Sequence, residues 1–86
     1  MEYIYPAVFT IDEEEPKYIN VRFPNIMGAF TFGEGMDDAL FMAEDLLRLY
    51  ITEIPKQCFP PSSLEEVRKE YPDAYDIRLI SVIVDD

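Results

Sequence analysis

The chain has 86 residues, 18 of them acidic and 7 basic, which gives a formal net charge of −11. This excess of carboxylates repels phosphate backbones and anionic membranes, so it argues against direct binding of nucleic acid or of a membrane surface. It favours a basic protein partner, or simply an acidic soluble domain. A chain of this length buries little more than about 60% of its unfolded surface, so residues 1–86 are expected to form a single domain.

Residue types limit the chemistry further. There is no His, and the single Cys58 allows neither an internal disulfide nor a metal-binding motif. No Ser or Cys has a base to activate it, so we expect no enzyme activity and no cofactor. The plentiful carboxylates keep a metal-dependent nuclease as the least favoured alternative. No signal peptide or spanning apolar run is evident, which predicts a cytoplasmic protein.

The first half of the sequence predicts three strands in a meander. Aromatic and β-branched residues indicate a strand over Tyr3–Ile11, and alternating apolar residues indicate another over Tyr18–Phe23. The acidic run Asp12–Glu15, followed by a proline, fits the hairpin connection between them. A short third strand is expected over Ala29–Phe32.

The turn between the second and third strands is unusually apolar. Pro24 ends the second strand, and the turn Asn25–Gly28 contains Ile26 and Met27. These two side chains either cap the edge of the core or form part of a contact surface.

One long helix is expected over Met36–Ile54. Gly33 and Gly35 suit the corner that leads into it, with Gly35 as N-cap, and the acids of its first turn suit the positive end of the helix dipole. Those acids also argue against a phosphate site at the glycines. Apolar residues recur every three or four positions and predict a core-facing stripe, formed by Met36, Ala39, Leu40, Ala43, Leu46, Leu47, Tyr50 and Ile54.

Three apolar residues lie off this stripe, namely Phe41, Met42 and Leu49. They lie among polar residues on the outer side of the helix. Phe41 and Met42 either pack against the loop that follows the helix or belong to a protein contact.

The remaining chain predicts a short helix and a last strand. A proline-rich connection runs from Pro55 to Ser63, and both Ser62 with Glu65 and Ser63 with Glu66 fit a capping box for a helix over Leu64–Glu70. The nearly unbroken apolar strand Tyr75–Val84 is expected inside the sheet, covered on both faces. One amphipathic helix covers one face only, so part of the second face should be covered by a partner or by self-association.

An ordered set of motifs resembles the HicB family of toxin-neutralising proteins. The segments are YPAVF, then FPNIMGAFTFGEGMDDAL, then PPSSLEEV, followed by the apolar last strand. Residues that match the family pattern in order and spacing are Phe23, Pro24, Gly28, Thr31, Gly33, Ala39, Leu40 and Ala43. Asn25, Met27 and Gly35 depart from it. Family members usually continue into a DNA-binding segment, which is absent from residues 1–86, so the resemblance does not extend to operator binding.

The resemblance implies an α+β fold of the partial ribonuclease-H-like type. Its elements are β-β-β-α-(short α)-β, with sheet order 3-2-1-4, one main helix packed on one face, and strand four parallel to strand one. The implied role is that of a type II antitoxin, which binds a small basic HicA-like mRNA-cleaving toxin and masks its active site. An acidic domain suits such a partner.

The residues on the outer side of the helix and in the apolar turn give a predicted partner-binding set, and the uncovered second face of the sheet predicts a homodimer or higher homo-oligomer. The set consists of Ile26, Met27, Phe41, Met42, Asp45, Arg48 and Leu49. The alternative is an orphan scaffold domain that only self-associates through its apolar sheet face.

Overall fold

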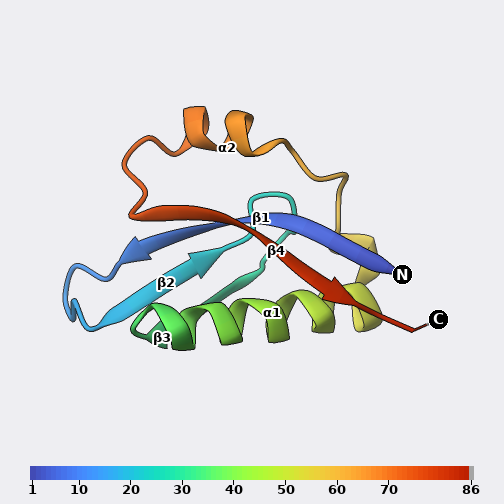
Figure 1. Ribbon diagram of the computed structural model, residues 1–86, viewed down its shortest axis with the longest axis horizontal. Coiled ribbons are helices and arrows are strands. Elements are labelled where there is room, and N and C mark those ends of the chain that lie inside the picture. The colour runs from blue at the N-terminus through green and yellow to red at the C-terminus, as the bar shows by residue number, and fades with distance from the viewer. Residues whose placement is uncertain (86) are drawn as a thin grey trace.

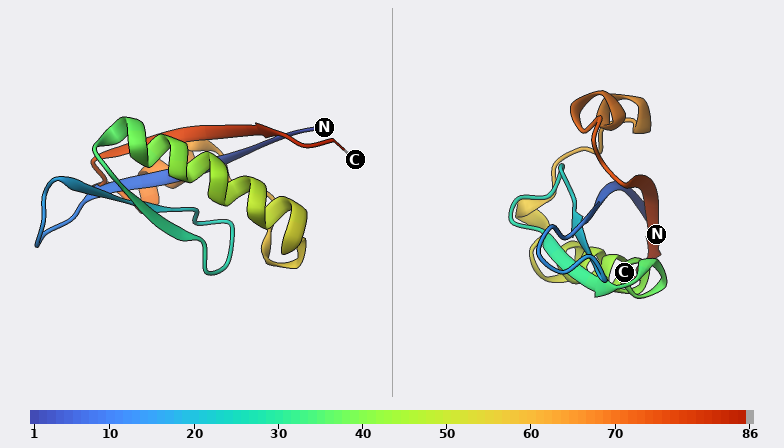
Figure 2. Two further views of the ribbon diagram at one scale, coloured as in Figure 1. Left: turned by 90° about the horizontal axis from the view of Figure 1, so that it is seen from below. Right: turned by 90° about the vertical axis from the view of Figure 1, so that its left-hand side faces the viewer.

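The computed structural model describes residues 1–85 and shows a four-stranded sheet between two helices (Figure 1). The elements are β1 (Glu2–Ile11), β2 (Tyr18–Arg22), β3 (Phe30–Glu34), α1 (Met36–Glu53), a 3-10 turn η1 (Pro55–Gln57), α2 (Leu64–Glu70) and β4 (Asp76–Ile83). The strand order is β3-β2-β1-β4, which confirms the predicted α+β class and sheet order. The two helices lie on opposite faces of the sheet, as the end-on view in Figure 2 shows.

The β1–β2 hairpin is closed by its acidic loop. The backbone N–H of Asp12 donates to the carbonyl of Tyr18 at 3.0 Å, and the Asp12 carboxylate accepts from the N–H of Glu15 at 2.9 Å and from Nδ2 of Asn20 at 3.0 Å. The hydrogen bonds that the Asp12 carboxylate accepts from Asn20 and from Glu15 favour its charged form, so they lower the pKa of Asp12. The strands pair with Phe9 opposite Val21, which places alternate residues on one face.

The main core lies between α1 and the sheet face that carries Phe9 and Val21. Ala39, Ala43 and Leu47 of α1 are fully buried against it. Small residues on the helix and Gly33 on β3 allow the two backbones to approach closely, because a side chain at position 33 would meet the backbone of the first helical turn. Gly35 has φ +85° and is the N-cap of α1, as predicted.

The two predicted capping serines have different roles. Ser63 is the N-cap of α2. Its Oγ accepts from the backbone N–H of Glu66, and its own backbone N–H donates to the Glu66 carboxylate, both at 3.1 Å. Ser62 instead pairs with Asn25, whose Nδ2 donates to Ser62 Oγ at 2.9 Å and whose Oδ1 accepts from the Ser62 N–H at 3.0 Å. The proline-rich connection is thereby fixed to the β2–β3 turn.

The last strand runs antiparallel to β1, not parallel as the resemblance implied. Helix α1 returns the chain to the end of the sheet where β1 begins, and direct entry from there would give a parallel strand. The connection through α2 instead crosses the opposite face and delivers the chain to the far end of β1, where the N–H of Tyr75 donates to the carbonyl of Phe9 at 2.9 Å. The strand then runs back along β1 to pair Ile83 with Glu2.

The sheet face opposite α1 is covered only in part. Helix α2 lies over it, and Pro6, Val8 and Val67 are buried there. Beyond α2 the face is open, since Leu79 is 52% and Ile83 67% exposed. Both parts of the prediction for the last strand are therefore wrong within this chain. Strand β4 lies at the edge of the sheet and not inside it, and its face opposite α1 is uncovered. Over residues 1–85, no helix is long and apolar enough to cross a membrane.

Candidate protein-binding surface

The structure places few reactive groups in chemically unusual surroundings. Burial raises the pKa of the Cys58 thiol, which disfavours the reactive thiolate. Burial is also the main reason that the pKa of Tyr5 is raised, and its hydroxyl donates to the carbonyl of Phe59 at 2.9 Å. Within residues 1–85, no cluster of three or more His, Cys, Asp or Glu side chains could hold a metal ion. The surfaces are therefore the features to compare.

The predicted helix residues share the side of α1 that faces away from the sheet. Phe41 is 66% and Leu49 47% exposed, and Met42 is half-buried. Asp45 and Arg48 are exposed and lie one and two turns after Phe41, on the same side. We call Phe41, Met42, Asp45, Arg48 and Leu49 the outer helix surface. It mixes apolar and charged groups, and its role in binding stays a prediction.

The two predicted turn residues point in different directions. Ile26 is only 2% exposed and belongs to the core. Its backbone is held in this position because its N–H donates to the Phe23 carbonyl and its strand bridge joins it to Cys58. Met27 is 62% exposed, and its N–H donates to the carbonyl of Gln57 in η1 at 3.0 Å. The turn therefore caps the edge of the core through Ile26, and Met27 alone of this pair is available to a partner.

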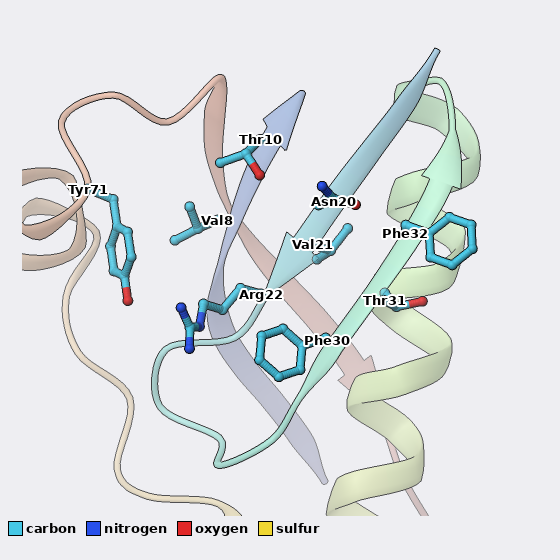
Figure 3. Close-up of a pocket in the computed structure, with 9 residues that line it drawn as sticks. All are labelled: Val8, Thr10, Asn20, Val21, Arg22, Phe30, Thr31, Phe32 and Tyr71. Carbon is cyan, nitrogen blue, oxygen red and sulfur yellow. The ribbon is translucent and has the colours of Figure 1, made fainter. Parts of the chain in front are cut away.

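A groove of about 590 Å³ lies on the other sheet face, between β3 and the end of α2 (Figure 3). Phe30 and Phe32 of β3 form one side and are 61% and 57% exposed, while Tyr71, which ends α2, forms the other (Figure 3). We call this the aromatic groove. Its lining residues are Val8, Thr10, Asn20, Val21, Arg22, Phe30, Thr31, Phe32 and Tyr71.

The aromatic side chains of the groove are held by their neighbours. The guanidinium of Arg22 lies over the ring of Phe30 at 5.1 Å from its centroid, a cation–π contact. The rings of Tyr18 and Phe32 meet edge to face, with centroids 5.5 Å apart and an interplanar angle of 87°. These contacts restrict the two large exposed rings, which lowers the entropy lost when a partner covers them.

The acidic hairpin, Asp12–Glu15, adjoins this groove. Phe32 and Asn20 also line a hollow of about 330 Å³ whose other walls include Asp12, Glu14 and Glu15. Two ion pairs occur in the part of the chain that the structure describes, Lys69–Glu65 and Arg78–Asp76, and neither uses a carboxylate of the hairpin. Apolar rings therefore lie next to negative charges that have no ion-pair partner there.

The aromatic groove is not part of the partner-binding set predicted from the sequence. Phe30 and Phe32 belong to the predicted third strand, where residues two apart lie on the same side. The available signal was the two-residue alternation, because Phe30 lies opposite Arg22 and Phe32 opposite Asn20 on the wetter side of β2.

Comparison with known proteins supports the fold. No protein-family model matches the sequence, and no curated protein matches it either. Among solved structures, a chain of a toxin–antitoxin complex from Streptococcus pneumoniae is similar, with a TM-score of 0.74 and 24% sequence identity. The match covers 96% of this chain and 70% of that one. This likeness shows that the two chains share a fold over almost the whole length of the present one.

Proposed function

We propose that this chain is a non-enzymatic antitoxin domain, which binds a small basic HicA-like ribonuclease toxin and masks its active site. The HicB-like motifs and the shared fold with a chain of a toxin–antitoxin complex support this role. The observation that carries the proposal is the aromatic groove beside the acidic hairpin, on a chain with a net charge of −11.

The groove and the hairpin supply complementary contributions to binding. Exposed aromatic rings are frequent anchors of protein interfaces, because they bury a large apolar area with little loss of side-chain freedom. The carboxylates of Asp12–Glu15 would attract Lys and Arg of a basic partner and speed encounter. The acidic surface thus steers the toxin, and Phe30 and Phe32 hold it.

Co-expression with a candidate toxin tests the function. The candidate is a short basic ribonuclease, the first to examine being one encoded beside this chain. We expect the chain to restore growth, to suppress RNA cleavage in vitro, and to co-purify with the toxin in a complex that salt weakens. Unchanged toxicity in the presence of stable, folded chain would contradict the proposal.

A matched pair of variants locates the surface. Phe30→Ala with Phe32→Ala removes the groove anchors, whereas Phe41→Ala with Leu49→Ala removes two exposed residues of the outer helix surface. Truncating an interface anchor costs about 2 kcal/mol, or roughly 30-fold in Kd. We expect that loss for the groove variant only. The reverse result would assign the contact to the outer helix surface and leave the antitoxin function in place.

Two other functions give different results in the same assays. An orphan scaffold domain, which the open sheet face favours, would self-associate but fail to neutralise any toxin. A metal-dependent nuclease would hydrolyse RNA when Mg²⁺ or Mn²⁺ is added and stop when the metal is chelated. Such hydrolysis by purified chain would contradict the non-enzymatic role.

A further inference from the structure

The outer edge of β4 combines exposed apolar side chains with a free strand edge. Over residues 1–85, β4 pairs with β1 only and ends the sheet on that side. On the α2 face, Leu79 and Ile83 of β4 and Ile4 of the neighbouring strand are 52%, 67% and 44% exposed. A long apolar edge strand of this kind invites another strand to pair with it.

The hydrogen-bond pattern shows which groups of β4 are free. Val84 and Met1 exchange backbone hydrogen bonds of 2.9 and 2.8 Å. The backbone N–H and C=O groups of residues 82, 80 and 78 therefore also point toward β1, and those of the alternate residues point outward, away from β1. The outward N–H of Ile77 donates to its neighbour Asp76 at 2.9 Å. The outward N–H groups of Leu79, Ser81 and Ile83 remain without a hydrogen-bond acceptor in residues 1–85, and Ser81 is the middle one of the three.

The opposite edge of the sheet is better protected. Strand β3 has five residues, and the outward N–H of Glu34 donates to the carboxylate of Asp38 at 2.8 Å. The free β4 segment carries no proline, and its outward-facing residues carry no charge, so it lacks the usual devices that block edge pairing. The β4 edge is therefore the more open of the two.

Charge decides which partner suits this edge. Between Ile77 and Val84 the only charged residue is Arg78, whose Nε is paired with Asp76 at 2.6 Å. A basic partner gains little here, since the carboxylates that would attract it lie mostly elsewhere on the surface. Ser81 Oγ also donates to the carboxylate of Glu2 at 2.6 Å, so each copy brings this one carboxylate to the edge besides the Arg78–Asp76 pair. A second copy of this chain still meets less repulsion here than at the acidic hairpin, where four carboxylates without an ion pair in the described residues lie together.

We propose that two copies pair antiparallel through β4, with Ser81 opposite Ser81 of the second copy. This register joins all three free N–H groups of each edge in hydrogen-bonded pairs, because Leu79 then lies opposite Ile83. The same apolar side chains cover each other across the strands. The interface is self-complementary, as a two-fold axis requires, and the result is one eight-stranded sheet. The inference does not depend on the antitoxin role.

Sedimentation and light scattering of the purified chain test the dimer. We expect a mass of twice the 10.0 kDa chain mass. Ser81→Pro removes an outward N–H without removing a bond to β1, so the variant should keep its fold and raise the dimer dissociation constant by at least about tenfold. Ser81→Ala keeps the N–H and should remain dimeric. A wild-type chain that stays monomeric at high concentration, or a Ser81→Pro variant that dimerises normally, would overturn the proposal.

Disulfide trapping tests the register. In a Cys58→Ser background, Ser81→Cys should form an intermolecular disulfide, because residues in a hydrogen-bonded pair have Cα atoms about 5.5 Å apart, within disulfide range. Leu79→Cys in the same background should not, because the two thiols would lie four residues apart along the strands. Efficient trapping of Leu79→Cys but not Ser81→Cys would refute this register.

Discussion

Gly33→Ala tests whether the close approach of β3 and α1 determines the corner at the start of the helix. A Cβ atom at position 33 would lie 2.6 Å from the carbonyl carbon of Asp38 and 2.7 Å from Cα of Ala39, and it would also meet the Ala39 nitrogen. These are all backbone atoms of the first helical turn. No side-chain rotation relieves the overlap, so the helix or the strand must move.

The expected cost follows from this geometry. Overpacking a well-filled core costs about 1–3 kcal/mol, and the upper end applies here because the overlap is with backbone atoms. For a domain of this size 1 kcal/mol corresponds to about 4–8 °C, so Gly33→Ala should lower Tm by roughly 12–24 °C. Thermal and urea unfolding followed by circular dichroism measure both quantities.

Two further variants separate the overlap from other effects. Glu34→Ala changes an exposed neighbouring residue and should shift stability by less than about 0.5 kcal/mol. Ala39→Gly added to Gly33→Ala should not restore stability, because the atoms in the way belong to the backbone of residue 39 and remain. The reasoning is refuted if Gly33→Ala costs less than about 1 kcal/mol, or if Ala39→Gly restores the loss.

Three other changes have contrasting expected outcomes. Leu47→Ala removes a fully buried side chain and should cost about 2–5 kcal/mol, whereas Leu49→Ala on the exposed side should cost less than about 0.5, both measured by urea unfolding. Hydrogen bonds from Ser63 lower the pKa of Glu66 below its ordinary value of 4.5, so their stabilisation is present above that pH and lost as pH falls through the folded pKa. Glu66→Gln should therefore flatten the acid side of a Tm–pH profile, and an unchanged profile would contradict this. Tyr5→Phe leaves the Phe59 carbonyl without its donor and should cost about 1 kcal/mol, and no loss would show that water replaces the bond.

Local periodicity was sufficient to predict the elements, because each has a pattern of its own. The stripe through Ala39, Ala43 and Leu47 could belong only to a core-facing helix, and the Ser–Glu spacing predicted α2 over Leu64–Glu70. The direction of β4 could not be read in this way. Its sequence is compatible with either direction, and the connection that decides it is held by a long-range pair, Asn25 with Ser62, and by burial of Val67.

The candidate surface was harder to predict than the core. An apolar residue such as Ile26 in a turn has no periodicity to show whether it faces inward, and the structure turns it inward through the backbone bonds of the turn. Phe30 and Phe32 share a side of a strand, but a strand of apolar residues is ordinarily assigned to the core. Their exposure depends on how far α2 extends across the sheet. That is a tertiary property, which no local pattern contains.

The proposed dimer and the proposed toxin complex are compatible in one particle. Strands β3 and β4 lie at opposite edges of the sheet, and a two-fold axis perpendicular to a continuous sheet keeps both aromatic grooves on the same face, one at each end. Charge nevertheless affects the two associations in opposite directions. Salt screens the repulsion between two chains of charge −11 and should tighten the dimer, whereas it screens the attraction for a basic toxin and should weaken that complex. Dissociation constants measured over a salt series should therefore diverge. If both associations weakened equally with salt, the β4 edge, where few charges lie, would not be the dimer interface.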